Sequence, residues 1–252
     1  MADISRSGSG SGRPAAGGGF AVVEMFTSQG CNSCPPAEEL LSEIDRDARE
    51  RGQPVYALGF HVDYWDHLGW ADPYGDPAHT RRQEAYARAL GSRGLYTPQM
   101  VVNGTVEFVG SDHRQASSAI TSALAEAAAT SLALSVEDVA EATGGGRRVV
   151  VGYQAERPPE RAVLNVAVVE RGLENDVPRG ENAGRRLRQD GVVRAFTSAK
   201  LDLGRGRVDI AVPPDLDPGH ASVVGYVQND GDKAIVGAAA VDVPPSAHGS
   251  GS

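Results

Sequence analysis

Two cysteines three residues apart, placed between an apolar segment and the start of a helix, are the feature that most constrains the fold of this chain. Residues 20–26 (FAVVEMF) form a nearly continuous apolar run, which is typical of a strand buried on both faces. The turn TSQG then leads to Cys31 and Cys34 in the segment CNSCPP, whose prolines suit the first turn of a helix. Leu40 and Ile44 follow at helical spacing. The sequence therefore predicts a strand, a cysteine pair and a helix in direct succession.

The segment up to residue 129 continues with alternating strand and helix patterns. A second strand is predicted at residues 55–62, and a third and fourth strand are joined by Asn103-Gly104, a strong signal for a two-residue hairpin turn. Helical patterns follow the first strand and cover residues 78–90 and the stretch after Ser111 or Asp112. We therefore expect an α/β domain with a βαβ start.

The pattern changes near residue 132, where helical periodicity stops. Seven short strands are predicted near residues 132–139, 147–154, 161–170, 192–200, 207–212, 221–228 and 233–241. One long loop is predicted at residues 171–191. Short strands at this spacing favour a β-sandwich.

The composition excludes several classes of protein. The chain has 252 residues and a net charge of −9 without a run of Lys or Arg, so we expect no nucleic-acid partner. Apolar runs stay below the roughly 20 residues of a membrane-spanning helix, so no membrane span is expected. Two cysteines are too few for a disulfide-rich scaffold. The Gly/Ser-rich residues 1–19 and the tail 246–252 are predicted to be flexible and to lie outside the fold.

The position of the cysteine pair suggests thiol chemistry. The free N–H groups and the dipole at a helix N-terminus stabilise a thiolate, which is the nucleophile in disulfide exchange. We assign Cys31 as the attacking thiol and Cys34 as the resolving thiol. The leading hypothesis is an enzyme, a thiol–disulfide oxidoreductase that acts on protein or small-molecule disulfides and needs a redox-recycling partner. No organic cofactor is expected, because neither a G-x-G-x-x-G motif nor a P-loop is present.

Three other interpretations of the pair stay open. A structural disulfide would close so short a loop that it would stabilise the fold weakly. A copper site could combine Cys31 and Cys34 with His61, because soft sulfur ligands and imidazole suit copper. A non-catalytic binding module, whose β-rich half docks a partner, would leave the cysteines without chemistry.

Residues at the end of the second predicted strand are expected to border Cys31, because the ends of neighbouring parallel strands meet at one edge of a sheet. His61 could modulate thiol ionisation there, or its ring could simply bond to the backbone. Asp63 and Trp65 follow in the loop, where Trp65, Trp70 and Tyr74 could form an apolar wall for a substrate or pack as ordinary loop residues.

These motifs carry a resemblance to known proteins. The strand–CxxC–helix start and Thr97-Pro98 before the strand MVVNG resemble the thioredoxin fold, in which a cis-proline faces the cysteines. The segments VVEMFTSQGCNSCPPAEELL, FHVDYWDHLGWADP, YTPQMVVNG and RGENAGRRL further resemble the secreted bacterial family called domain of unknown function 1223, over about residues 20–242. The resemblance implies export to the periplasm or beyond, with any native signal peptide missing from this sequence.

The resemblance also implies a fold and roles for individual residues. It predicts a thioredoxin-like α/β domain at residues 20–130, followed by an all-β, sandwich-like domain at residues 131–245. Pro98 would be a cis-proline that, with Thr97, presents backbone to an extended substrate and keeps metal from the thiols. Glu24 would be a buried acid that relays a proton to or from Cys34. The alternative for Glu24 is a carboxylate on a sheet face that is paired with an arginine.

Overall fold

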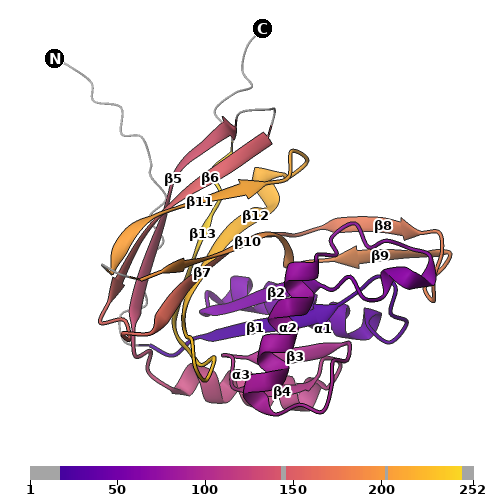
Figure 1. Cartoon of the computed structure of the whole chain (residues 1–252), viewed down its shortest axis with the longest axis horizontal. Helices are drawn as coiled ribbons and strands as arrows, with labels where there is room; N and C mark the ends of the chain where they lie inside the picture. Colours follow the sequence, from indigo (N-terminus) through magenta and orange to yellow (C-terminus); the bar gives the residue numbers. More distant parts are fainter. Residues whose placement is uncertain (1–17, 143–145, 202–203, 246–252) are drawn as a thin grey trace, which may run out of the picture.

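The computed structural model describes residues 18–142, 146–201 and 204–245. The first part of the chain forms the predicted alternation of strands and helices (Figure 1). Prolines begin the first two long helices, left-handed glycines end them, and the Asp112 carboxylate caps the third. These elements are β1 (Ala21–Thr27), α1 (Pro35–Arg51), β2 (Val55–His61), the 3₁₀ turn η1 (Asp66–Leu68), α2 (Pro77–Leu90), β3 (Gln99–Val102), β4 (Val106–Val109) and α3 (His113–Ala125).

The second part of the described chain consists of strands and one 3₁₀ turn. All seven predicted strands are present, but the predicted loop at residues 171–191 is wrong. That segment contains two additional antiparallel strands, which pair only with each other. The elements are β5 (Ser131–Ala142), β6 (Gly146–Glu156), β7 (Ala162–Glu170), β8 (Leu173–Val177), β9 (Arg185–Gln189), β10 (Val192–Lys200), β11 (Arg205–Val212), η2 (Pro218–His220), β12 (Ala221–Asn229) and β13 (Ile235–Asp242).

The strand order corrects the predicted fold class. A thioredoxin-like α/β domain followed by an all-β sandwich would need two separate sheets, but one mixed sheet of eight strands runs through both parts in the order β13-β12-β7-β10-β2-β1-β3-β4. The junction is the parallel pair of β10 with β2, where Val192 faces Gly59. The structure is therefore a mostly β protein built on a shared sheet. The boundary predicted between residues 130 and 131 precedes β5 and stays a prediction.

The buried side chains gather in three clusters that define the layers. One cluster lies between the sheet and helices α1 and α3, and a second lies on the opposite sheet face, beneath α2. The third lies between the three-stranded sheet β11-β6-β5 and strands β7, β12 and β13. In β7, Val168 belongs to this third cluster and Val169 to the α2 side, so the small sheet covers the same face as α1 and α3. Helix α1, which begins directly after Cys34, thus packs on the same face of the eight-stranded sheet as α3 and the small sheet.

Candidate active site around the Cys31–Cys34 disulfide

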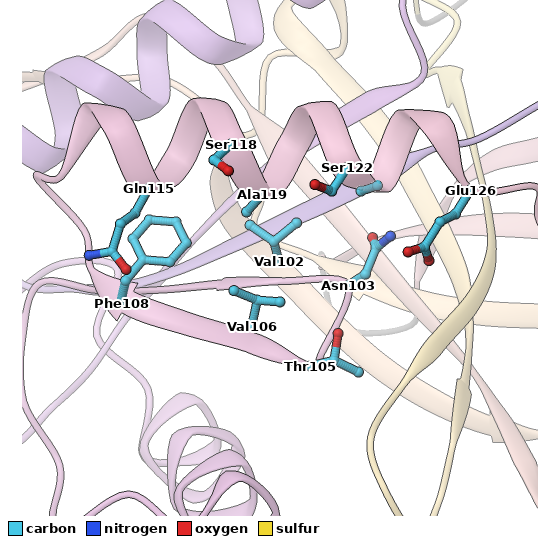
Figure 2. Close-up of a pocket in the computed structure, with 11 residues that line it drawn as sticks. Val102, Asn103, Thr105, Val106, Phe108, Gln115, Ser118, Ala119, Ser122 and Glu126 are labelled. Atoms are coloured by element: carbon cyan, nitrogen blue, oxygen red, sulfur yellow. The ribbon is translucent and has the colours of Figure 1, made fainter.

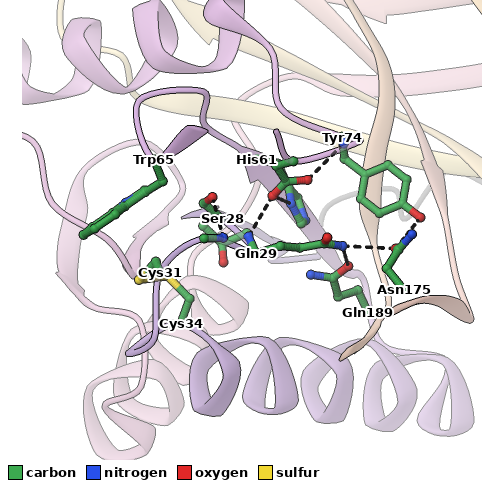
Figure 3. Close-up of polar contacts among 12 residues, drawn as sticks. Ser28, Gln29, Cys31, Cys34, His61, Trp65, Tyr74, Asn175 and Gln189 are labelled. Atoms are coloured by element: carbon green, nitrogen blue, oxygen red, sulfur yellow. Dashed lines mark hydrogen bonds and ion pairs between the residues drawn. A yellow bond between two sulfur atoms is a disulfide. The ribbon is translucent and has the colours of Figure 1, made fainter. Parts of the chain in front are cut away.

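Cys31 and Cys34 form a disulfide where β1 ends and α1 begins (Figure 3). Cys34 is the N-cap residue of α1, so the predicted position of the pair at a helix N-terminus is confirmed. The side chains are buried, with 1% of Cys31 and 0% of Cys34 exposed, whereas Asn32 and Ser33 between them are exposed. The sulfur atoms are therefore covered although the loop that holds them reaches the surface.

The segment before β3 closes over one side of the pair. The Thr97–Pro98 peptide bond is cis, as predicted, and the Thr97 carbonyl oxygen lies 3.8 Å from Cys31 Sγ. The Ser33 hydroxyl lies 3.3 Å from that sulfur and donates to the same carbonyl. The Trp65 indole N–H donates to Thr97 Oγ1 at 2.8 Å. Thr97, Pro98 and Trp65 are thus brought to the cysteines, and their roles toward a substrate stay predictions.

His61 lies below the cysteine loop in a buried polar network. Its Nδ1 is 2.7 Å from Asp72 Oδ2, and the same carboxylate oxygen accepts the backbone N–H of Gln29 at 2.7 Å. The Gln29 side chain in turn donates to Asn175 and Gln189, on β8 and β9 (Figure 3). The network connects the end of β2, the cysteine loop and the β8–β9 hairpin. Sequence reasoning found His61 but missed Asp72 and Gln29, which it treated as ordinary loop residues.

Charges in this network shift the pKa values of their neighbours. Burial alone would lower the pKa of His61, but the charge and hydrogen bond of Asp72 outweigh burial and raise it. Burial would raise the pKa of Asp72, but the charge of His61 and three hydrogen bonds lower it. The two side chains thus stabilise each other as an imidazolium–carboxylate pair.

The raised pKa of His61 predicts how stability depends on pH. The folded protein holds a proton that the unfolded chain releases above about pH 6.5, so the free energy of unfolding should fall as pH rises from there through the folded pKa. The lowered pKa of Asp72 acts only below about pH 3.9, and the lowered pKa of His79 only below about pH 6.5. The buried carboxyl group of Glu38, whose pKa burial also raises, adds a loss of the same sign that begins at about pH 4.3. We therefore expect His61→Gln to make the fall in the free energy of unfolding with pH, measured by urea denaturation, smaller, and the exposed control His67→Gln to leave it unchanged. Parallel curves for wild type and His61→Gln would contradict the assignment.

Glu38 is a buried carboxyl group that the sequence did not single out. It lies one helical turn after Cys34 on α1, its backbone N–H donates to the Cys34 carbonyl, and its Oε1 accepts the Thr27 hydroxyl at 2.7 Å. Residues at i and i+4 share a helix face. Burial raises the pKa of Glu38, and the opposing charge of His61 does not cancel this. A carboxyl group that can exchange protons therefore lies on the face of α1 that begins at Cys34.

Glu24 and Asp63 make their contacts elsewhere. Glu24 belongs to the α2 side of the sheet, opposite α1, where its carboxylate accepts Arg82 Nε at 2.8 Å and Tyr226 Oη at 2.6 Å. The arginine-paired alternative thus describes Glu24, and none of its contacts among the described residues leads to Cys34. The Asp63 carboxylate accepts the Thr80 hydroxyl on α2.

The tip of the β8–β9 hairpin, residues 178–184, contacts the cysteine loop from the other side. The buried Asn182 amide donates to the carbonyl oxygens of Gln29 and Cys31, both at 2.9 Å. The Glu181 carboxylate accepts the backbone N–H of Asn32 at 3.0 Å. This segment overlaps the motif RGENAGRRL, which was predicted to lie in a loop. Hairpin strands of five residues with polar side chains give little periodic signal, so the sequence did not reveal them.

A copper site of Cys31, Cys34 and His61 gains no geometric support. Both sulfur atoms are used by the disulfide, and His61 Nδ1 is held by Asp72. Over the described ranges, no three His, Cys, Asp or Glu side chains are grouped so that they could hold a metal ion.

No helix within these ranges is long and apolar enough to cross a membrane.

A separate hollow lies between α3 and the β3–β4 hairpin (Figure 2). Its wall combines apolar and polar side chains, among them Phe108, Val106 and Gln115. Asn103, at its end, is already engaged, because its side chain accepts the Val22 N–H and donates to the Phe20 carbonyl. The hollow contains neither cysteine nor any residue predicted for the site.

Comparison with protein families places these features in context. Residues 22–228 match the family described as "Protein of unknown function (DUF1223)". The chain belongs to the DUF1223 family. The predicted resemblance is therefore confirmed, and the cysteine loop, Pro98 and the hairpin tip all lie within the matched part of this DUF1223 protein.

Solved structures support the fold but name no activity for this DUF1223 protein. It is similar to the crystal structure of protein AGR_C_4864 from Agrobacterium tumefaciens, with 28% identity, a TM-score of 0.57, and coverage of 90% of this chain and 95% of that one. DesR, a β-glucosidase from Streptomyces venezuelae, aligns with 17% identity and a TM-score of 0.21 over 48% of this chain and 16% of that one, which carries no argument. The comparison with curated proteins gave no match.

Proposed function

We propose that this DUF1223 protein is a thiol–disulfide oxidoreductase that uses Cys31 and Cys34. The observation that carries the proposal is the disulfide at the N-terminus of α1, with the Thr97 carbonyl beside Cys31 Sγ. A bridge between residues three apart constrains little of the unfolded chain, so it contributes little as a structural cross-link. A helix N-terminus, in contrast, favours the thiolate that exchange requires.

The proposed reaction begins from the dithiol form. The Cys31 thiolate attacks one sulfur of a partner disulfide, and the other partner sulfur leaves as a thiolate. The Cys34 thiol then passes its proton to Glu38 and attacks Cys31 Sγ, which releases the second partner thiol. The partner gains two electrons, and its two thiolates take up the proton that Cys31 lost to solvent and the proton that Glu38 returns. Cys31–Cys34 becomes the disulfide seen in the structure. A dithiol reductant returns the pair to its starting state.

Two residues near the pair are proposed to position the substrate. Thr97 and Pro98 present a carbonyl and a cis peptide bond next to Cys31, and Trp65 holds Thr97 through the indole hydrogen bond. We place the reaction in the periplasm or outside the cell, because the resemblance to a secreted bacterial family implies export.

Variants of the two cysteines test this function. Cys34→Ser should accumulate a mixed disulfide through Cys31 when the reduced protein meets oxidised glutathione or a disulfide-containing protein, because no thiol remains to resolve the adduct. Cys31→Ser should form no such adduct, because Cys34, as the N-cap residue of α1, is assigned only to attack on Cys31 and not on a partner disulfide. Mass spectrometry of the intact protein measures both.

The control is the double Cys31→Ser/Cys34→Ser variant, which reports adducts at other positions. Equal adduct yields from the two single variants, or none from Cys34→Ser, would contradict the assigned order of attack and the proposed activity.

A further inference from the structure

The disulfide is less accessible than the proposed reaction requires. Only 1% of Cys31 is exposed, although Cys31 Sγ must be reached by a partner sulfur. One side is covered by Trp65 and Thr97, which come from the first part of the chain, as the cysteine loop does. The other side is covered by the hairpin tip, which comes from the second part of the chain. The tip is therefore the cover that can be removed without unfolding α1.

The contacts of the tip are directed at the cysteine loop itself. Asn182 bridges the carbonyl oxygens on either side of Gly30, at Gln29 and Cys31, and is fully buried. The Glu181 carboxylate accepts a hydrogen bond from the backbone N–H of Asn32, the residue directly after Cys31. Three hydrogen bonds thus hold the tip on the four-residue stretch that contains the attacking cysteine.

The hairpin is built so that the tip is a separate arm. Strands β8 and β9 form a two-stranded sheet that does not join the eight-stranded sheet (Figure 1). Gly172 and Gly191 flank the hairpin and have left-handed φ values of 72° and 68°. The stem is anchored through Asn175 and Gln189 to Gln29, whereas the hydrogen bonds that hold the tip beyond Val177 come from Glu181 and Asn182, and Gly180 of the tip lies close to Trp70. Release of these two side chains would free the tip alone.

The charge of Glu181 links this contact to the redox state. In the disulfide form the helix N-terminus carries no thiolate, and the Glu181 carboxylate can bond to the Asn32 N–H without opposition. A Cys31 thiolate would place a second negative charge next to that N–H and compete for the same positive end of the helix. The two negative charges would repel each other, so we expect reduction to weaken the contact between Glu181 and Asn32.

We propose that the hairpin tip is a redox-sensitive strap, which is fastened over the disulfide form by Glu181 and Asn182 and is released in the dithiol form. This inference rests on the proposed function, because it assigns the strap to the same cysteine pair. Release opens Cys31 to an incoming disulfide, and refastening after Cys34 closes the bridge displaces the product.

The rate of chemical reduction tests the strap without any biological substrate. Dithiothreitol attacks the bridge as a thiolate, forms a mixed disulfide, and closes to its own cyclic disulfide, which leaves two thiols on the protein. We expect Asn182→Ala and Glu181→Ala to be reduced about tenfold faster than wild type, because each loses hydrogen bonds that keep the bridge covered. The matched control is Asp176→Ala, which truncates an exposed acid on the same hairpin. Its rate should equal that of wild type.

Hydrogen exchange of the full chain supplies the second measurement. Amides of residues 179–184 should exchange faster in reduced than in oxidised wild type, while amides of α1 beyond its first turn should not change. Rates of reduction within twofold of wild type for Glu181→Ala, which truncates an exposed side chain and should fold, would overturn the strap, as would equal exchange of the tip in both redox states. Faster reduction of the variants together with absence of adducts in Cys34→Ser would retain the strap and reject the oxidoreductase.

Discussion

The Glu24→Ala variant is expected to lose about 3–5 kcal/mol of its free energy of unfolding, because Arg82 would stay buried without its counter-charge. The Arg82 side chain is 12% exposed and Glu24 is fully buried. The guanidinium also lies over the rings of Phe60, Tyr86, Phe196 and Tyr226. Urea denaturation at neutral pH measures the change.

The same cluster connects the two parts of the chain. Glu24 is on β1 and Arg82 is on α2, while Tyr226 Oη, which donates to Glu24, comes from β12. The loss should therefore shift one common unfolding transition instead of unfolding the N-terminal part alone. The control Arg148→Ala breaks an exposed pair with Asp209 and should change stability by no more than about 0.5 kcal/mol.

A double variant separates charge burial from packing. Glu24→Ala/Arg82→Met removes both charges, so it should recover part of the stability lost in Glu24→Ala. A Glu24→Ala variant no less stable than Arg148→Ala would contradict the role assigned to the carboxylate. This outcome would also argue against a role for the buried pair of Glu24 and Arg82 in holding the two parts of the chain together.

Local elements of this fold could be predicted from the sequence, whereas their assembly could not. Apolar runs, helix-start prolines and the Asn103-Gly104 turn are local signals, and the corresponding strands and helices are present. The pairing of β10 with β2 joins residues more than a hundred positions apart, and nothing in the apolar run of β2 tells which strand lies beside it. The fold class was therefore wrong although most of its elements were right.

The residues of the candidate site likewise fall into those that local sequence signals mark and those whose positions depend on the assembled fold. Cys31, Cys34 and Pro98 were found because spacing and resemblance mark them directly. Glu24 was singled out as a charge in an apolar strand, but strand alternation turns it away from α1, toward Arg82. Glu38 looked like an ordinary acid in a first helical turn, where carboxylates are common, so its burial beneath Thr27 could not be foreseen.

Asn182 is a residue that the sequence did not single out, because its role depends on contacts that are distant in the sequence. An asparagine in a Gly-rich segment reads as a turn residue, and its contacts to Gln29 and Cys31 span about 150 positions of sequence. Only the recurrence of RGENAGRRL in the family resemblance marked the segment, and a motif without a structural partner assigns no role. Long-range contacts to backbone carbonyls leave no pattern that a single sequence can reveal.

The Glu38→Gln variant is expected to slow the resolving step about 100-fold at neutral pH, within the range of general-base catalysis. The step is attack of Cys34 on a mixed disulfide between Cys31 and thionitrobenzoate, and its rate is followed by the coloured thiolate released. Glu39→Gln is the matched control, because it removes an exposed acid from the next position of the same helix turn. It should leave the rate unchanged.

The direction of the change distinguishes proton transfer from simple electrostatics. If Glu38 acted only as a nearby negative charge, its removal would favour the Cys34 thiolate and speed the attack. A slower step with Gln, and a wild-type rate that rises with pH only until Glu38 ionises and then levels off below the pKa of the Cys34 thiol, instead requires that the carboxylate accepts the proton. The raised pKa of Glu38 fits this role, because burial brings a carboxyl group toward the pH at which it can both take and return a proton. A faster step in Glu38→Gln would remove Glu38 from the reaction and leave solvent as the acceptor.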